Sequence, residues 1–127
     1  MAEIILSNRM QALTDMVTPG TVITDVGCDH GFVSVYLVQK GISPRVIAMD
    51  VRPGPLEHAR EHIREYGLED RIETRLSDGL HSLKTGEAAG MICAGMGGPL
   101  MEKILTEGRE QAKGFRELIL QPQSEIP

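Results

Sequence analysis

The sequence predicts an α/β fold built on a doubly wound parallel sheet. Short apolar runs alternate with longer segments of helical periodicity along all 127 residues, and each run stops close to a Gly, Asp or Pro. Right-handed crossovers between such strands give the order 3-2-1-4-5. Ligands bind these sheets where the order reverses, so the loops after the first and fourth strands are expected to face each other.

Five strands are expected, at 22–26, 45–49, 72–76, 91–94 and 118–121. The third alternates apolar side chains with Glu and Arg, which is typical of an edge strand. Pro122 stops the fifth strand, because proline cannot continue a ladder of hydrogen bonds. Five strands are therefore expected within residues 1–127.

Four helices are expected beside these strands. Ser7 suits the N-cap of the first, and the inward side chains of this helix should be Met10, Leu13, Met16 and Val17. A buried helix at 31–40 and a surface helix at 55–66 are each followed by glycine, as helix C-termini often are. A last helix, with Pro99 in its first turn, should run to about residue 110.

The composition limits the kinds of partner. The net charge is −5, which argues against broad capture of nucleic acid through its phosphates, although another segment could hold one. There are two Phe, two Tyr and no Trp. The two cysteines, and the lack of a secretory leader or a membrane-length apolar run, predict a reduced cytoplasmic protein without a membrane partner.

The loop after the first strand disfavours NAD. It reads Asp25-Val26-Gly27-Cys28-Asp29-His30-Gly31, in which Gly27 lets the backbone approach a ligand closely. A dinucleotide site needs glycines spaced G-x-G-x-x-G to hold pyrophosphate, and that spacing is absent. Asp29 stands where the second glycine would be, and its charge would repel phosphate.

Four acidic residues are expected on one rim of the sheet. S-adenosylmethionine has a sulfonium, an ammonium and no phosphate, so carboxylates favour it. Asp25 could accept from the ammonium, Asp50 from the ribose hydroxyls and Asp78 from the adenine amine. The full predicted cofactor-binding set is Asp25, Gly27, Cys28, Asp29, His30, Asp50, Val51, Ser77, Asp78, Gly79, Ala94 and Gly95. A simpler explanation, an Asp that only caps the next helix, competes most strongly at Asp78.

The glycine-rich loop after the fourth strand is the candidate acceptor site. Gly95, Met96 and Gly97 would form a slot with backbone walls for a flat group, and with Asp29 they are the candidate catalytic residues. The alternative is a turn that only allows a helix to pack closely.

No metal site is predicted. His58 and His62 are one helical turn apart, a spacing that can bind zinc, but no third ligand is evident among their Arg and Glu neighbours. A solvated helix face is the simpler interpretation. Cys28, His30 and Cys93 are not expected to converge, and no Ser or Cys has an evident base partner for nucleophilic catalysis.

The sequence resembles the N-terminal part of the bacterial tRNA adenine N1-methyltransferases that act on adenine 22. The resemblance rests on short motifs in order along the chain: Leu6-Ser7 with Arg9, Asp25-Val26-Gly27 with Asp29-His30, Gly54-Pro55, Gly67-Leu68, Gly79-Leu80, Ala94-Gly95-Met96-Gly97-Gly98 and Leu120-Gln121-Pro122.

The resemblance implies a Rossmann-like class I methyltransferase fold that uses S-adenosylmethionine to methylate N1 of an adenine in tRNA. Residues 1–127 would form the cofactor-binding domain, incomplete because family members continue with further strands and a helical region that holds tRNA. Asp29 could orient the adenine amine. The exposed fifth strand could then support self-association. Two alternatives remain: a methyltransferase for a small molecule or protein, and a non-catalytic cofactor-binding fragment.

Overall fold

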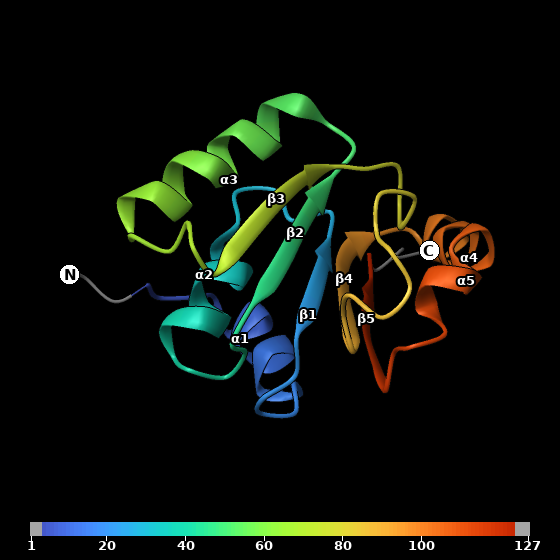
Figure 1. The fold of residues 1–127 in the computed structure, drawn as a ribbon, viewed down its shortest axis with the longest axis horizontal. Coiled ribbons are helices and arrows are strands. Elements are labelled where there is room, and N and C mark those ends of the chain that lie inside the picture. Colours follow the sequence, from blue (N-terminus) through green and yellow to red (C-terminus); the bar gives the residue numbers. More distant parts are fainter. Residues whose placement is uncertain (1–3, 124–127) are drawn as a thin grey trace.

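A computed structural model describes residues 4–123, in which five parallel strands form a sheet of order β3-β2-β1-β4-β5 (Figure 1). The strands are β1 (Ile23–Val26), β2 (Val46–Asp50), β3 (Ile72–Leu76), β4 (Gly90–Met96) and β5 (Glu117–Pro122). All neighbouring pairs in this sheet run parallel. The predicted fold class and strand order are confirmed, and β3 lies at an edge as its alternating pattern predicted.

Helices cover both faces of the sheet (Figure 1). They are α1 (Asn8–Asp15), α2 (Phe32–Gln39), α3 (Pro53–Glu65), α4 (Gly98–Glu107) and α5 (Arg109–Ala112). Among the helices of residues 4–123, none is long and apolar enough to cross a membrane.

Strand alternation divides the sheet between two hydrophobic cores. Val46 and Ala48 pack with buried side chains of α1, α2 and α3, whereas Ile47 and Met49 pack with α4 and the segment between β3 and β4. Ile23 belongs to the first core. Asp25 is two residues further along β1 and shares this face, so its side chain points toward α2.

Two helix predictions need correction. Met16 was expected to face inward but is 64% exposed, because α1 ends at Asp15 and its periodicity does not extend to the next residue. The last predicted helix is interrupted at Gly108, between α4 and α5. A Cβ atom at Gly108 would lie 2.7 Å from the Leu80 side chain, so the backbone at this interruption packs closely against Leu80.

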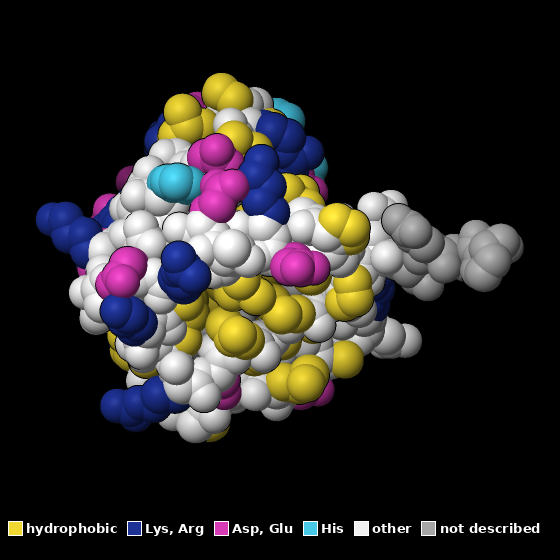
Figure 2. Space-filling view, turned by 90° about the vertical axis from the view of Figure 1, so that its right-hand side faces the viewer, with side chains coloured by type: hydrophobic (Ala, Val, Ile, Leu, Met, Phe, Trp, Pro, Cys, Tyr) yellow, Lys and Arg dark blue, Asp and Glu magenta, His cyan; other side chains and the backbone are white. Residues whose placement is uncertain are grey.

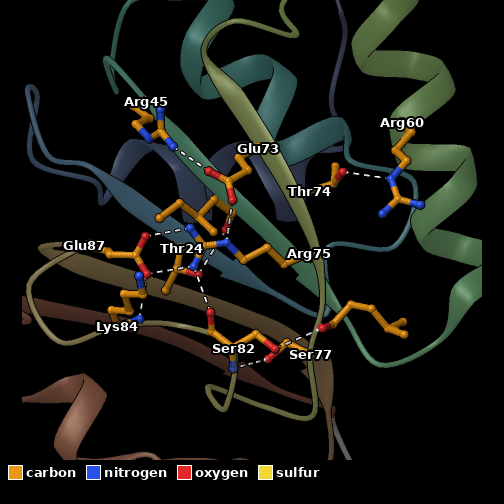
Figure 3. Close-up of polar contacts among 12 residues, drawn as sticks. Thr24, Arg45, Arg60, Glu73, Thr74, Arg75, Ser77, Ser82, Lys84 and Glu87 are labelled. Atoms are coloured by element: carbon orange, nitrogen blue, oxygen red, sulfur yellow. Dashed lines mark hydrogen bonds and ion pairs between the residues drawn. The ribbon is translucent and has the colours of Figure 1, made fainter.

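A polar network fixes the segment between β3 and β4 (Figure 3). Arg75 donates to Glu73 at 2.6 Å and to both carboxylate oxygens of Glu87 at 2.7 and 2.6 Å. The hydrogen bond from Arg75 is the main reason why the pKa of Glu87 falls to about 2. Ser77 Oγ donates to the Gly79 carbonyl and accepts from the Ser82 N–H. The network therefore holds the turn after β3 at the carboxyl edge of the sheet.

Candidate functional site

A cavity of ≈ 570 Å³ opens at the carboxyl ends of the strands, where the strand order reverses. The loops after β1, β2, β3 and β4 all contribute to its wall, as the topology predicts. The predicted site residues that line it are Asp25, Gly27, Cys28, Asp29, Asp50, Val51, Ser77, Asp78, Gly79, Ala94, Gly95, Met96 and Gly97. Four loops that are distant in sequence thus surround one space.

The loop after β1 bends across the end of β2. The N–H groups of Gly27 and Cys28 both donate to the Met49 carbonyl, at 2.8 and 2.9 Å. Gly27 has a φ of +77°, and a Cβ atom there would lie 2.5 Å from Met96 Cε. Glycine suits this position because its φ lies in the left-handed region, where a side chain is strained, and a Cβ atom would also have to displace the end of the Met96 side chain.

Asp25 is a buried carboxyl group at the floor of the cavity. Ser34 of α2 donates its hydroxyl to Asp25 Oδ2 at 2.8 Å. Burial raises the pKa of Asp25 to about 6, and the negative charges of Asp50 and Asp29 add to this, although the Ser34 hydrogen bond opposes it. A bound cation would relieve the desolvation of this carboxylate, so the floor favours a positively charged ligand group.

Asp50, at the end of β2, accepts four hydrogen bonds. Its Oδ1 accepts from the Arg52 N–H at 3.0 Å and Nε at 3.1 Å, and its Oδ2 accepts from the Asp29 N–H at 3.0 Å and Arg52 Nη2 at 3.3 Å. Burial acts to raise the pKa of Asp50, but the hydrogen bonds from Arg52 and Asp29 hold it below its ordinary value. Asp50 is therefore an anion that lines the cavity and pairs with the Arg52 guanidinium.

The backbone of Asp29 is unusual for a residue with a side chain. Its φ is +53°, in the left-handed region that favours glycine. The hydrogen bond from its N–H to Asp50 supports this conformation. Its carboxylate remains largely exposed and lies 3.8 Å from His30 Nε2 and 3.9 Å from Arg52 Nη2. Asp29 therefore presents an accessible charge at the mouth of the cavity.

The wall opposite these carboxylates is mostly apolar. β4 continues to Met96, past its predicted end at residue 94, and its pairing with β5 is irregular between Ala94 and Met96. Gly95 has a φ of +75° at this irregularity and is one of the residues that line the cavity. Sequence reasoning missed further lining residues, among them Met10, Val33, Arg52, Ile92, Leu100, Ile104 and Gln123. Residues spread over several helices, strands and loops give no local signal that they will meet at one cavity.

His30, a predicted cofactor-binding residue, follows Asp29 in the chain but is not among the residues that line the cavity. Its ring instead joins a ring cluster with Phe32, His58 and His62. The predicted solvated face of α3 is thus only partly right, because His62 is half-buried and packs against Phe32 at 4.6 Å. Within residues 4–123, no group of three or more His, Cys, Asp or Glu side chains is arranged to hold a metal ion.

Both cysteines are buried and free. Burial raises the pKa of the Cys93 thiol to about 12 and that of Cys28 still further above its ordinary value. Neither thiol is therefore ionised near neutral pH, which agrees with the prediction that neither acts as a nucleophile.

The parallel sheet, its strand order and the cavity at the carboxyl ends of its strands define a Rossmann-like domain. Residues 6–127 match the profile of the family described as methyltransferase domain, and the chain belongs to this family.

The chain is also similar to tRNA methyltransferases. It is 37% identical over 122 residues to the tRNA (adenine(22)-N(1))-methyltransferase of Bacillus subtilis, covering 96% of this chain and 51% of that protein. Streptococcus pneumoniae Sp1610 in complex with S-adenosyl-L-methionine superposes with a TM-score of 0.91 at 34% identity, covering 95% of this chain and 57% of that one. M. capricolum TrmK in complex with S-adenosyl-homocysteine superposes with a TM-score of 0.85 at 27% identity, covering 95% of this chain and 54% of that one. The chain spans about half the length of these relatives.

Proposed function

We propose that the cavity binds S-adenosylmethionine and that the protein transfers its methyl group to N1 of adenine 22 in tRNA. The observation that carries this proposal is the set of four carboxylates, Asp25, Asp29, Asp50 and Asp78, that line one cavity at the point where the strand order reverses. Such a rim suits a cationic nucleoside and repels a pyrophosphate. The named activity of the Bacillus subtilis relative supports the choice of acceptor.

The cofactor roles follow from the chemistry of each side chain. Asp50 would accept both ribose hydroxyls, which take over the hydrogen bonds that Arg52 now donates. Asp25 would accept from the ammonium group. Asp78 is exposed beside the cavity and would accept from the exocyclic amine of the adenine ring. The remaining predicted residues that line the cavity form its walls: Gly27, Cys28, Val51, Ser77, Gly79 and Ala94.

The acceptor adenine would lie against the loop of Gly95, Met96 and Gly97. Its N1 lone pair forms the new N–C bond while the sulfur–methyl bond breaks and the sulfur keeps the electron pair. No proton has to leave before this step, so the residues mainly position donor and acceptor in line. N1 becomes cationic, and Asp29, the exposed carboxylate at the mouth, would stabilise that charge or orient the adenine amine.

Methyl transfer to tRNA transcripts tests this function. Transcripts with adenine 22 or with guanine 22 would be incubated with the protein and labelled S-adenosylmethionine. We expect label only in the adenine transcript, at N1 of residue 22. Equal labelling of both transcripts would refute the assignment of the acceptor. Labelling of small molecules or proteins alone would favour another methyltransferase of the same fold. Because the proposed substrate is tRNA, the proposed place of action is the cytoplasm.

We also propose that the protein self-associates through β5. This strand lies at the sheet edge formed by residues 4–123, and Leu118 and Leu120 are 47% and 37% exposed. Figure 2 shows hydrophobic side chains gathered on the side of the molecule where β5, α4 and α5 lie. Sheet edges with unpaired backbone groups recruit further strands. Sedimentation at several concentrations should show a dimer that dissociates on dilution, and a monomer at every concentration would contradict the proposal.

A further inference from the structure

The ring cluster of His30, Phe32, His58 and His62 lies beside the cavity, and none of the four is among the residues that line it. His30 stacks on His58 with ring centroids 5.2 Å apart and planes 9° apart, and on Phe32 at 5.8 Å and 19°. The cluster therefore contains three nearly parallel rings: Phe32 at the start of α2, His30 two residues before it, and His58 in α3.

Backbone packing brings these rings together and holds them. Gly31 has a φ of +78°, and a Cβ atom there would lie 3.1 Å from that of Ala59, so the start of α2 approaches α3 closely. His62 Nδ1 lies 2.7 Å from the His30 carbonyl oxygen. A carbonyl can only accept, so Nδ1 carries the proton and this hydrogen bond fixes the ring of His62.

The rings are accessible. The side chain of His30 is 45% exposed, and Phe32 is 42% exposed. The Asp29 carboxylate lies 3.8 Å from His30 Nε2, and Arg52 Nη2 lies 3.9 Å from the same carboxylate. Exposed ring faces suit a flat group that stacks on them.

We propose that the ring cluster is a stacking platform for an unpaired nucleobase next to the adenine that enters the cavity. This inference rests on the proposed function. An adenine must leave its helical stack to react, and its neighbour then loses a stacking partner. Phe and His rings stack on unpaired bases in RNA. His30 directly follows Asp29, which lines the cavity, so one short stretch of RNA can reach both sites.

RNA binding by the chain saturated with S-adenosyl-homocysteine tests the platform. A labelled single-stranded oligoadenylate would be titrated against the wild type and variants, and the Phe32 and histidine ring signals followed by NMR. Phe32→Leu with His58→Ala should weaken RNA binding roughly 5- to 100-fold. The matched control His81→Ala removes an exposed histidine that pairs with Glu107 and should change affinity less than about twofold. His58→Tyr, which keeps an aromatic face, should retain wild-type affinity.

The readouts separate the platform from the proposed function. Calorimetry with S-adenosyl-homocysteine reports on the cofactor site, and all variants should keep wild-type affinity for it. If the wild type does not bind S-adenosyl-homocysteine, the proposed function fails. If it does bind, but the ring signals do not respond to RNA or the double variant keeps full RNA affinity, the platform is refuted while the cofactor site stands.

Discussion

Replacing Asp25 with Asn tests whether the floor of the cavity is an ionisable cation site. The pKa of Asp25 is raised from 3.8 to about 6, chiefly by burial, so the folded protein holds this proton more tightly than the unfolded chain does. The free energy of unfolding should therefore fall as the pH rises from about 4 to about 6. At about 1.4 kcal/mol per pH unit, this interval corresponds to ~3 kcal/mol.

Urea unfolding at pH 4 and pH 8 measures this effect. Asn cannot ionise, yet its side-chain oxygen can still accept the Ser34 hydrogen bond. The wild type should lose ~3 kcal/mol relative to Asp25→Asn between these two pH values. Ser34→Ala serves as a control. Without the Ser34 hydrogen bond, which lowers the pKa of Asp25, the pH-dependent loss of stability in this variant should extend to higher pH than in the wild type. Parallel pH profiles for wild type and Asp25→Asn would refute the reasoning.

The same substitution reports on ligand binding. An ionised Asp25 would attract the ammonium group of the cofactor, so wild-type affinity for S-adenosyl-homocysteine should increase as the pH rises through about 6. Asp25→Asn should bind more weakly at pH 8 and should lose this pH dependence. Calorimetric titrations at pH 5 and pH 8 measure both effects.

Three further substitutions test other parts of the account. Asp50→Ala should weaken S-adenosyl-homocysteine binding by ~1.5–3 kcal/mol in calorimetry; unchanged affinity in a folded variant would rule out the ribose role. Gly27→Ala should lower the urea midpoint, because alanine is strained at a φ of +77° and its Cβ atom would displace the end of the Met96 side chain; an unchanged midpoint would contradict this. The wild type should lose stability as the pH falls from 4.5 to about 2, and Glu87→Gln should not show this loss; acid unfolding curves that coincide for the two proteins would count against the Arg75 network.

Local signals in the sequence predicted the fold well. Ser7 accepts from the Met10 N–H as the expected N-cap, and Gly41 and Gly67 have positive φ where α2 and α3 end. These features depend on a residue and its immediate neighbours, so a single sequence contains them. The strand order followed in turn from the alternation of strands and helices and from the handedness of crossovers.

Contacts between distant segments were not predictable in the same way. Asp29 donates its N–H to Asp50 only because the loop after β1 bends across the end of β2, and Ser34 meets Asp25 only because α2 packs across β1. Nothing in the sequence indicated that the ring of His30, which follows the left-handed backbone of Asp29, would pack on His58 of α3. Side-chain direction at such turns depends on tertiary packing, which spacing alone does not encode.

Competition between two nucleoside ligands tests the central claim most directly. The chain would be titrated with S-adenosyl-homocysteine in a calorimeter in the presence of a metal chelator, with and without excess NAD. We predict saturable binding that neither the chelator nor NAD reduces, because the rim of Asp25, Asp29, Asp50 and Asp78 repels pyrophosphate. Absence of binding, or displacement of S-adenosyl-homocysteine by NAD, would contradict the account.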